Sequence, residues 1–154
     1  MKNLGVSIAD EAVKFVRARV PYQHRGMSMF GCDCTGLLIA VFHRLGLFRQ
    51  YKLRVYKLDW NLNAGADDYI REELGKVAIR VPNSQLQVGD VLVFRFGRCA
   101  AHVGVFIKPN VFAHCYKEQG RCCYGTLESS PWGRRWISTY RFDEEKVLRA
   151  NKYG

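Results

Sequence analysis

The sequence predicts an α+β fold in which helices come first and a mostly antiparallel sheet comes last. Apolar residues recur at helical spacing in two early segments, residues 7–19 and 33–46. From residue 77 onward the chain changes to short apolar and aromatic runs separated by turn residues, a pattern typical of strands. The length of 154 residues suits one domain with a substantial core, so we expect residues 1–154 to form a single domain.

The first helix is expected over residues 7–19, with Ser7 as its N-terminal cap. Val20 should end the helix because a residue before proline is pushed out of the helical conformation. Residues 22–30 are then expected to form a loop that leads to the second helix.

The second helix carries a cysteine in its first turn. Asp33 is a favoured N-cap residue, and Gly46 stands where a C-terminal glycine would end the helix. The apolar stripe between them predicts a buried helix. A thiol at position 34 would face the positive end of the helix dipole, which favours the thiolate and makes Cys34 a candidate nucleophile.

The remaining elements follow from local patterns. A short helix is expected over residues 66–74, and Lys108-Pro109-Asn110 should close a tight hairpin. Residues 87–90 read as a turn, whereas residues 47–65 carry no clear pattern beyond some strand-like character before residue 58. The expected strands are residues 77–81, 91–96, 101–108, 111–116, 122–127 and 136–142.

Charge and hydropathy limit the partners. The net charge is +10, from 24 basic and 14 acidic residues, which favours a polyanionic neighbour such as nucleic acid, anionic lipid or an acidic envelope polymer. The basic residues are scattered and do not alternate with aromatic residues, so we expect no specific nucleic-acid binding. No apolar run is long enough for a membrane span, and the N-terminus lacks the apolar segment of a signal peptide, so we expect no export by a signal of its own.

The six cysteines are expected to be free thiols, because the chain has a full core and shows no signal peptide. They lack the Cys-x-x-Cys spacing of recognisable zinc sites, so no metal and no cofactor are expected. Cys32 should be a packed loop cysteine. Most of the later cysteines should be small core residues, namely Cys99, Cys115, Cys122 and Cys123.

Two of the four histidines fall on predicted strands that form one hairpin. His102 and His114 lie on neighbouring strands at positions of the same parity, so their rings should be able to touch. A cysteine at a helix N-terminus, a histidine base and a third residue that orients the base form the arrangement of a cysteine hydrolase. The alternative is a buried histidine pair with a structural role, and the spacing leaves both interpretations open.

Motifs along most of the chain resemble the NlpC family of papain-fold cell-wall peptidases. The matching motifs are Asp33-Cys34-Thr35-Gly36-Leu37, His102-Val103-Gly104-Val105, Phe112-Ala113-His114, Pro21-Tyr22 followed by Gly26, and Gly89-Asp90-Val91-Leu92-Val93-Phe94. The resemblance implies a papain-like fold whose nucleophile helix packs on a mostly antiparallel sheet. Thr35 replaces the usual Ser or Ala, and only Gly26 matches a Gly-Gly pair of the family.

The same resemblance implies roles for single residues. Cys34 would be the nucleophile, His102 the base and His114 the residue that orients it. Tyr22, Asp33 and Thr35 would contribute to the substrate side of the site. The family implies cleavage of an amide bond in the peptidoglycan stem peptide, commonly after D-glutamate, without a cofactor.

A narrower resemblance points to the phage-tail branch of this family. It is carried by Pro21-Tyr22-Gln23-His24-Arg25-Gly26, Gly31-Cys32-Asp33-Cys34, Leu58-Asp59-Trp60 and Trp132-Gly133-Arg134-Arg135-Trp136. It implies a protein made in the host cytoplasm, held at the virion tail tip by other tail-tip or hub proteins, and active in the bacterial envelope, the periplasm included. Two alternatives stay open: a structural tail-hub protein that retains the fold, and another amidase or acyltransferase of the same fold.

Overall fold

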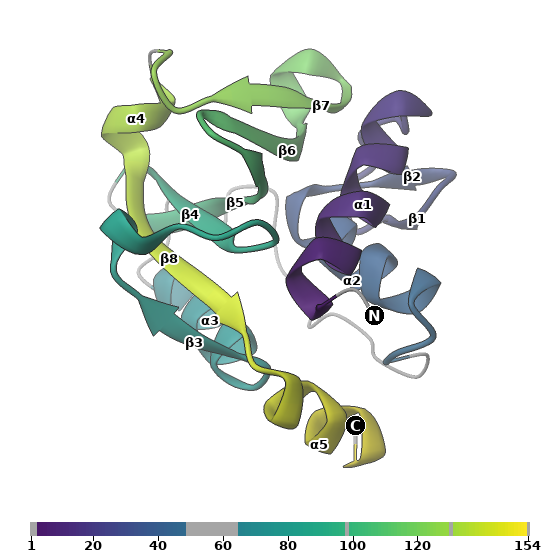
Figure 1. The fold of residues 1–154 in the computed structure, drawn as a ribbon. Helices are drawn as coiled ribbons and strands as arrows, with labels where there is room; N and C mark the ends of the chain where they lie inside the picture. The colour runs from purple at the N-terminus through teal and green to yellow at the C-terminus, as the bar shows by residue number, and fades with distance from the viewer. Residues whose placement is uncertain (1–2, 49–64, 98, 130, 154) are drawn as a thin grey trace.

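The centre of the molecule is a six-stranded sheet with the strand order β3-β8-β4-β5-β6-β7 (Figure 1). The computed structural model describes residues 3–48, 65–97, 99–129 and 131–153. All neighbouring strands are antiparallel. The strands are β3 (Ala78–Val81), β4 (Val91–Phe96), β5 (Cys99–Lys108), β6 (Val111–Tyr116), β7 (Arg121–Thr126) and β8 (Trp136–Phe142). The predicted α+β class with a mostly antiparallel sheet is therefore confirmed.

Helices α1 (Leu4–Arg17) and α2 (Cys34–Arg44) pack together against β5 and β6, on the same side of the sheet (Figure 1). Helix α3 (Gly65–Gly75) contacts β3 and β5. The one-turn helix α4 (Trp132–Arg135) precedes β8, and α5 (Glu144–Tyr153) follows it. The nucleophile-candidate helix thus lies on the strands that carry both candidate histidines.

Side chains alternate between the two faces of a strand, and the sheet accordingly separates two apolar clusters. The main core lies between the helices and the sheet and includes Ile8, Phe15, Leu37, Val41, Val93, Val103 and Val105. The second cluster uses the alternate strand positions and consists of Leu92, Phe94, Phe106, Phe112 and Trp132. His102 and His114 have the parity of this second cluster and contact its rings.

The first helix begins three residues before the predicted cap. Asn3 caps α1, and its side-chain oxygen accepts a hydrogen bond from the Val6 amide at 2.8 Å. Ser7 is already inside the helix, and its amide donates to the Asn3 carbonyl. The prediction of Ser7 as cap was wrong because Asn3 offers an equally good cap one turn earlier. The helix also ends before residue 19, since Arg19 takes a left-handed conformation with φ of 52°.

The predicted loop before α2 contains a short hairpin. Strands β1 (Met27–Ser28) and β2 (Gly31–Cys32) pair with each other, and Tyr22 forms an isolated bridge to Cys32. The expectation of a plain loop over residues 22–30 was therefore wrong in part. Strands of two residues carry too few side chains for a period of two to be visible in the sequence.

Most later elements match their predictions. The strands 91–96, 111–116 and 136–142 have the predicted bounds, and the others differ by one or two residues. The hairpin at Lys108-Pro109-Asn110 is confirmed, with Asn110 left-handed at φ of 70°. The strand-like character before residue 58 lies almost wholly outside the described residues. Within the described part of the chain, no helix has the length and apolarity that a bilayer crossing requires.

Candidate active site

Asp33 fixes the start of α2. Its Oδ1 accepts hydrogen bonds from the Gly36 amide at 2.7 Å and the Thr35 hydroxyl at 3.3 Å. Its Oδ2 accepts the Arg25 amide at 2.9 Å, which ties the helix to the segment before β1. The carboxylate is 3% exposed, so the predicted N-cap is confirmed. These bonds place Cys34 at the first residue of the helix.

Cys34 is partly buried, and its sulfur lies against the backbone of the sheet. Burial, and after it the Asp33 carboxylate, raises the pKa of the Cys34 thiol to about 12. Hydrogen bonds from the Val103, Thr35 and Cys34 amides act in the opposite direction. The amides at the start of α2 thus favour the thiolate as expected, but desolvation and the neighbouring carboxylate outweigh them, and the net shift of the pKa is upward.

The two histidines are joined directly. His102 Nε2 and His114 Nδ1 lie 2.7 Å apart, and the side chains are 6% and 2% exposed. The predicted contact between the rings is therefore confirmed. Val103, whose amide reaches the Cys34 sulfur, is the next residue after His102. The Cys34 sulfur thus contacts the β5 backbone at the residue after His102. The bond to His114 uses Nε2 of His102 and not its Nδ1.

Burial also keeps both imidazoles neutral. Desolvation, followed by the charges of His114 and Arg135, lowers the pKa of His102 well below its usual value of 6.5. Desolvation alone lowers the pKa of His114 to about 3. Desolvation therefore shifts the Cys34 thiol and both imidazoles toward their neutral forms.

Aromatic rings enclose the histidine pair. The ring of Trp132 stacks on His102 with a centroid distance of 5.3 Å and an interplanar angle of 29°. The ring of Tyr116 stacks on His114 at 5.4 Å and 11°. Phe94 and Phe96 complete the contacts around His102. These rings restrict the imidazoles to one orientation and exclude water from them.

None of these aromatic residues was expected in the site from the sequence. Trp132 stood out only as part of a motif of the narrower resemblance. The one available signal for Tyr116 was its parity with His114 on the same strand.

The predicted substrate-side residues differ in exposure. Tyr22 is partly exposed and lies near Asp33 and Cys34, and burial followed by the charges of these two groups raises its hydroxyl pKa to about 12. Thr35 is also partly exposed, although its hydroxyl donates to Asp33. The buried Asp33 carboxylate is positioned to hold the helix, so a direct contact with substrate stays a prediction.

The other histidines lie in different surroundings. His43 Nε2 lies 2.9 Å from the Phe48 carbonyl, near the end of α2. His24 lies in the segment before β1, and its Nδ1 is buried. The site chemistry described above does not use either residue.

The helices packed on a six-stranded antiparallel sheet, with a cysteine at a helix N-terminus, match the papain-like fold of NlpC/P60 structures. The profile of the NlpC/P60 family matches residues 19–141. The chain therefore belongs to the NlpC/P60 family.

A curated relative is the murein DD-endopeptidase MepS/murein LD-carboxypeptidase of Escherichia coli strain K12. It is 26% identical over 122 residues, which cover 79% of this chain and 55% of the relative. This chain thus spans about half the length of that protein.

Two solved structures share the fold. NlpC2 from Trichomonas vaginalis superposes with a TM-score of 0.67 at 17% identity, over 92% of this chain and 48% of the other. The NlpC/p60 domain of the peptidoglycan hydrolase SagA superposes with a TM-score of 0.60 at 18% identity, over 91% of this chain and all (100%) of the other.

Proposed function

We propose that this protein is a peptidoglycan hydrolase, a cysteine endopeptidase that cleaves an amide bond of the stem peptide. The observation that carries the proposal is the position of Cys34 at the start of α2, where its sulfur meets the amide of Val103, the residue that follows His102 on β5. The bond between His102 and His114 supplies the third member of a Cys-His-His set. The family assignment and the murein hydrolase activities in the name of the Escherichia coli relative support the choice of substrate.

Acylation begins from the neutral pair. His102 Nδ1 takes the thiol proton as the Cys34 sulfur attacks the carbonyl carbon, so a C–S bond forms and the carbonyl oxygen becomes negative. The Cys34 amide at the helix N-terminus is the natural donor to this oxygen. The imidazolium then returns its proton to the amine nitrogen, the C–N bond breaks, and a thioester remains on Cys34.

Deacylation reverses the proton path. His102 takes a proton from water as the water oxygen attacks the thioester carbon. The C–S bond then breaks, the imidazolium gives its proton to the departing sulfur, and a carboxylic acid and the Cys34 thiol result. His114 holds the His102 ring through the Nε2–Nδ1 hydrogen bond and shares the positive charge that forms during each half-reaction.

The net charge of +10 suits an anionic target. Stem peptides carry free carboxylates and bacterial envelopes are anionic, so long-range attraction raises the rate of encounter. We propose action in the envelope on this basis.

Purified protein should release soluble stem-peptide fragments from peptidoglycan sacculi, and mass spectrometry should identify a new terminus at an amide bond. The Cys34→Ala variant should release none, whereas Glu145→Ala should keep the wild-type rate because, in the described part of the chain, the exposed Glu145 side chain pairs only with Arg149 of the same helix, α5. Equal release by Cys34→Ala and wild type would refute the proposal.

We further propose that this activity serves at a phage tail tip, where it opens the peptidoglycan for genome delivery. This setting rests on the narrower sequence resemblance alone. Virions that carry Cys34→Ala should assemble with normal tails and fail at envelope penetration. Particles without tails would instead favour the structural role of a tail-hub protein.

A further inference from the structure

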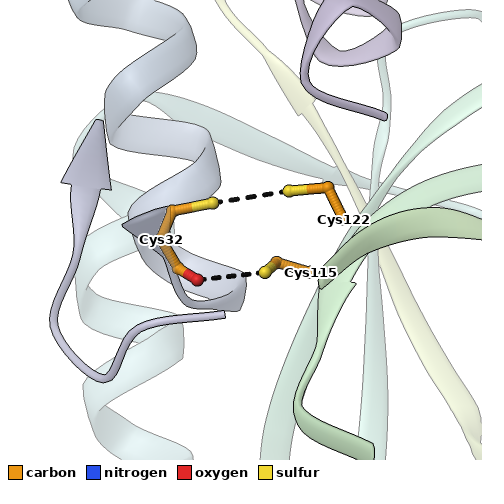
Figure 2. Close-up of side chains that lie close together, drawn as sticks. All are labelled: Cys32, Cys115 and Cys122. Atoms are coloured by element: carbon orange, nitrogen blue, oxygen red, sulfur yellow. Dashed lines mark hydrogen bonds between the residues drawn. The ribbon is translucent and has the colours of Figure 1, made fainter. Parts of the chain in front are cut away.

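Three buried cysteines that the proposed reaction does not use have their sulfur atoms close together in the core. The sulfur atoms of Cys32, Cys115 and Cys122 all lie within 4.8 Å of one another. The three side chains are 0%, 1% and 1% exposed. Figure 2 shows the Cys32 sulfur pointing toward the Cys122 sulfur, at 3.5 Å, and the Cys115 sulfur pointing toward the Cys32 carbonyl oxygen, at 3.0 Å.

The backbone fixes this convergence. Cys115 and Cys122 are directly paired across β6 and β7, so their side chains leave the sheet on the same face. Cys32 is held opposite them because its amide donates to the Pro21 carbonyl, while the Cys122 amide donates to Val20. The three sulfurs therefore come from two rigid parts of the fold and not from one mobile loop.

We propose that Cys32, Cys115 and Cys122 form a thiolate site for one zinc ion. In a tetrahedral zinc site with Zn–S bonds of about 2.3 Å, neighbouring sulfurs lie about 3.8 Å apart. The sulfurs here need to move by no more than about 1 Å to reach that spacing. Zinc binding replaces the three S–H protons, which are released to solvent, and leaves a net charge of −1 on the zinc and its three thiolates.

The Cys32 carbonyl oxygen is a candidate fourth ligand. It accepts the Cys115 thiol in the metal-free arrangement, and deprotonation of that thiol removes the donor. The same oxygen also accepts the Gln23 amide at 3.0 Å, which holds it in place beside the sulfurs.

The site would join the two halves of the catalytic arrangement. Cys32 is two residues before Cys34, and Cys115 directly follows His114. A metal bound by both segments would hold the nucleophile and the histidine pair in a fixed relation, without touching the substrate. This role is independent of which bond the protein cleaves.

The test is the number of zinc ions bound per full chain. The protein is purified with a phosphine reductant, stripped of metal with a chelator and then dialysed against Zn²⁺. Wild type should retain about one zinc ion per chain, and its zinc X-ray absorption should report three sulfur ligands at about 2.3 Å. With free zinc at about 100-fold above Kd, the Tm should rise by about 5–10 °C.

Matched variants separate this site from the catalytic cysteine. Cys32→Ala and Cys122→Ala should lose the zinc and the Tm increase, whereas Cys34→Ala and Cys123→Ala should keep both. If the first two variants do not fold, the X-ray absorption of wild type still decides, because a metal on Cys34 and the histidines would show nitrogen ligands.

Wild-type protein that stays folded and retains no zinc would overturn the proposal. So would zinc that is retained by folded Cys32→Ala, or zinc that is lost from Cys34→Ala. A Cys32–Cys122 disulfide with no zinc binding after reduction would assign the cluster to thiol oxidation instead.

Discussion

Removal of the Asp33 carboxylate should destabilise the start of α2 and, through it, the position of Cys34. Asp33→Ala removes the cap bond to the Gly36 amide, which contributes about 1 kcal/mol to stability. It also leaves the Arg25 amide without the acceptor that it has at 2.9 Å, at a further cost of about 1–2 kcal/mol. The expected loss of unfolding free energy is about 2–3 kcal/mol, which corresponds to a decrease in Tm of about 5–10 °C.

Asp33→Asn separates the cap from the charge. The asparagine oxygen can still accept the Gly36 amide, so the decrease in Tm should be smaller than for alanine. Loss of the negative charge should lower the pKa of Cys34, because Asp33 is one of the two causes that raise it. Calorimetry gives Tm, and the pH dependence of iodoacetamide alkylation in a chelator-containing buffer gives the thiol pKa.

Glu145→Ala is the matched control, since its exposed ion pair with Arg149 contributes little. If Asp33→Ala melted within about 1 °C of wild type, the carboxylate would not hold the helix as described. An unchanged alkylation profile in Asp33→Asn would show that Asp33 does not act on the Cys34 thiol.

Three further predictions concern packing and protonation. Gly36→Ala should strongly destabilise the protein in urea unfolding, because the added Cβ would clash with the Gly26 carbonyl oxygen. In the matched variant Gly75→Ala the added Cβ meets no atom within 4 Å, so the change should be neutral or stabilising by up to about 1 kcal/mol. Equal urea midpoints for the two variants would contradict this. The free energy of unfolding should fall as pH decreases below about 6.5, because the unfolded chain binds protons that the buried His102 and His114 exclude. The slope should be about 1.4 kcal/mol per pH unit for each histidine, and His114→Gln should reduce it. A free energy of unfolding that stays constant down to a pH of about 4 would count against buried neutral rings. Trp132→Ala should lower the free energy of unfolding by about 3–5 kcal/mol and should lower kcat more than it raises KM, because the ring stacks on His102. Trp132→Phe should recover most of the stability and most of kcat. A change in KM alone would instead mean that Trp132 contacts the substrate.

The local patterns of the chain predicted much of the fold. Asp33 and Gly46 bound α2 as expected, and Gly46 takes φ of 80°. The contact between His102 and His114 followed from strand parity and the hairpin at Pro109. These features depend on neighbours in the sequence, which is why a single sequence reveals them.

Other features depend on residues that are far apart in the chain. Cys32, Cys115 and Cys122 match no local metal motif, since only the fold brings their sulfurs together. The desolvation that raises the pKa of Cys34 also comes from the packing of the whole fold and leaves no local signal in the sequence. By contrast, α5 was missed although Asp143 caps it through the Lys146 amide and Glu144 follows directly, a pattern that the sequence does contain.

The most direct test of the central claim is the identity of the acylated residue. The protein is mixed with excess soluble stem peptide, quenched in acid during turnover, digested and analysed by mass spectrometry. We expect the acyl fragment on the peptide that contains Cys34, and its accumulation should decrease in His102→Ala. An acyl group on Cys123 or Cys32, or turnover by Cys34→Ala at the wild-type rate, would contradict the assignment of Cys34 as the nucleophile.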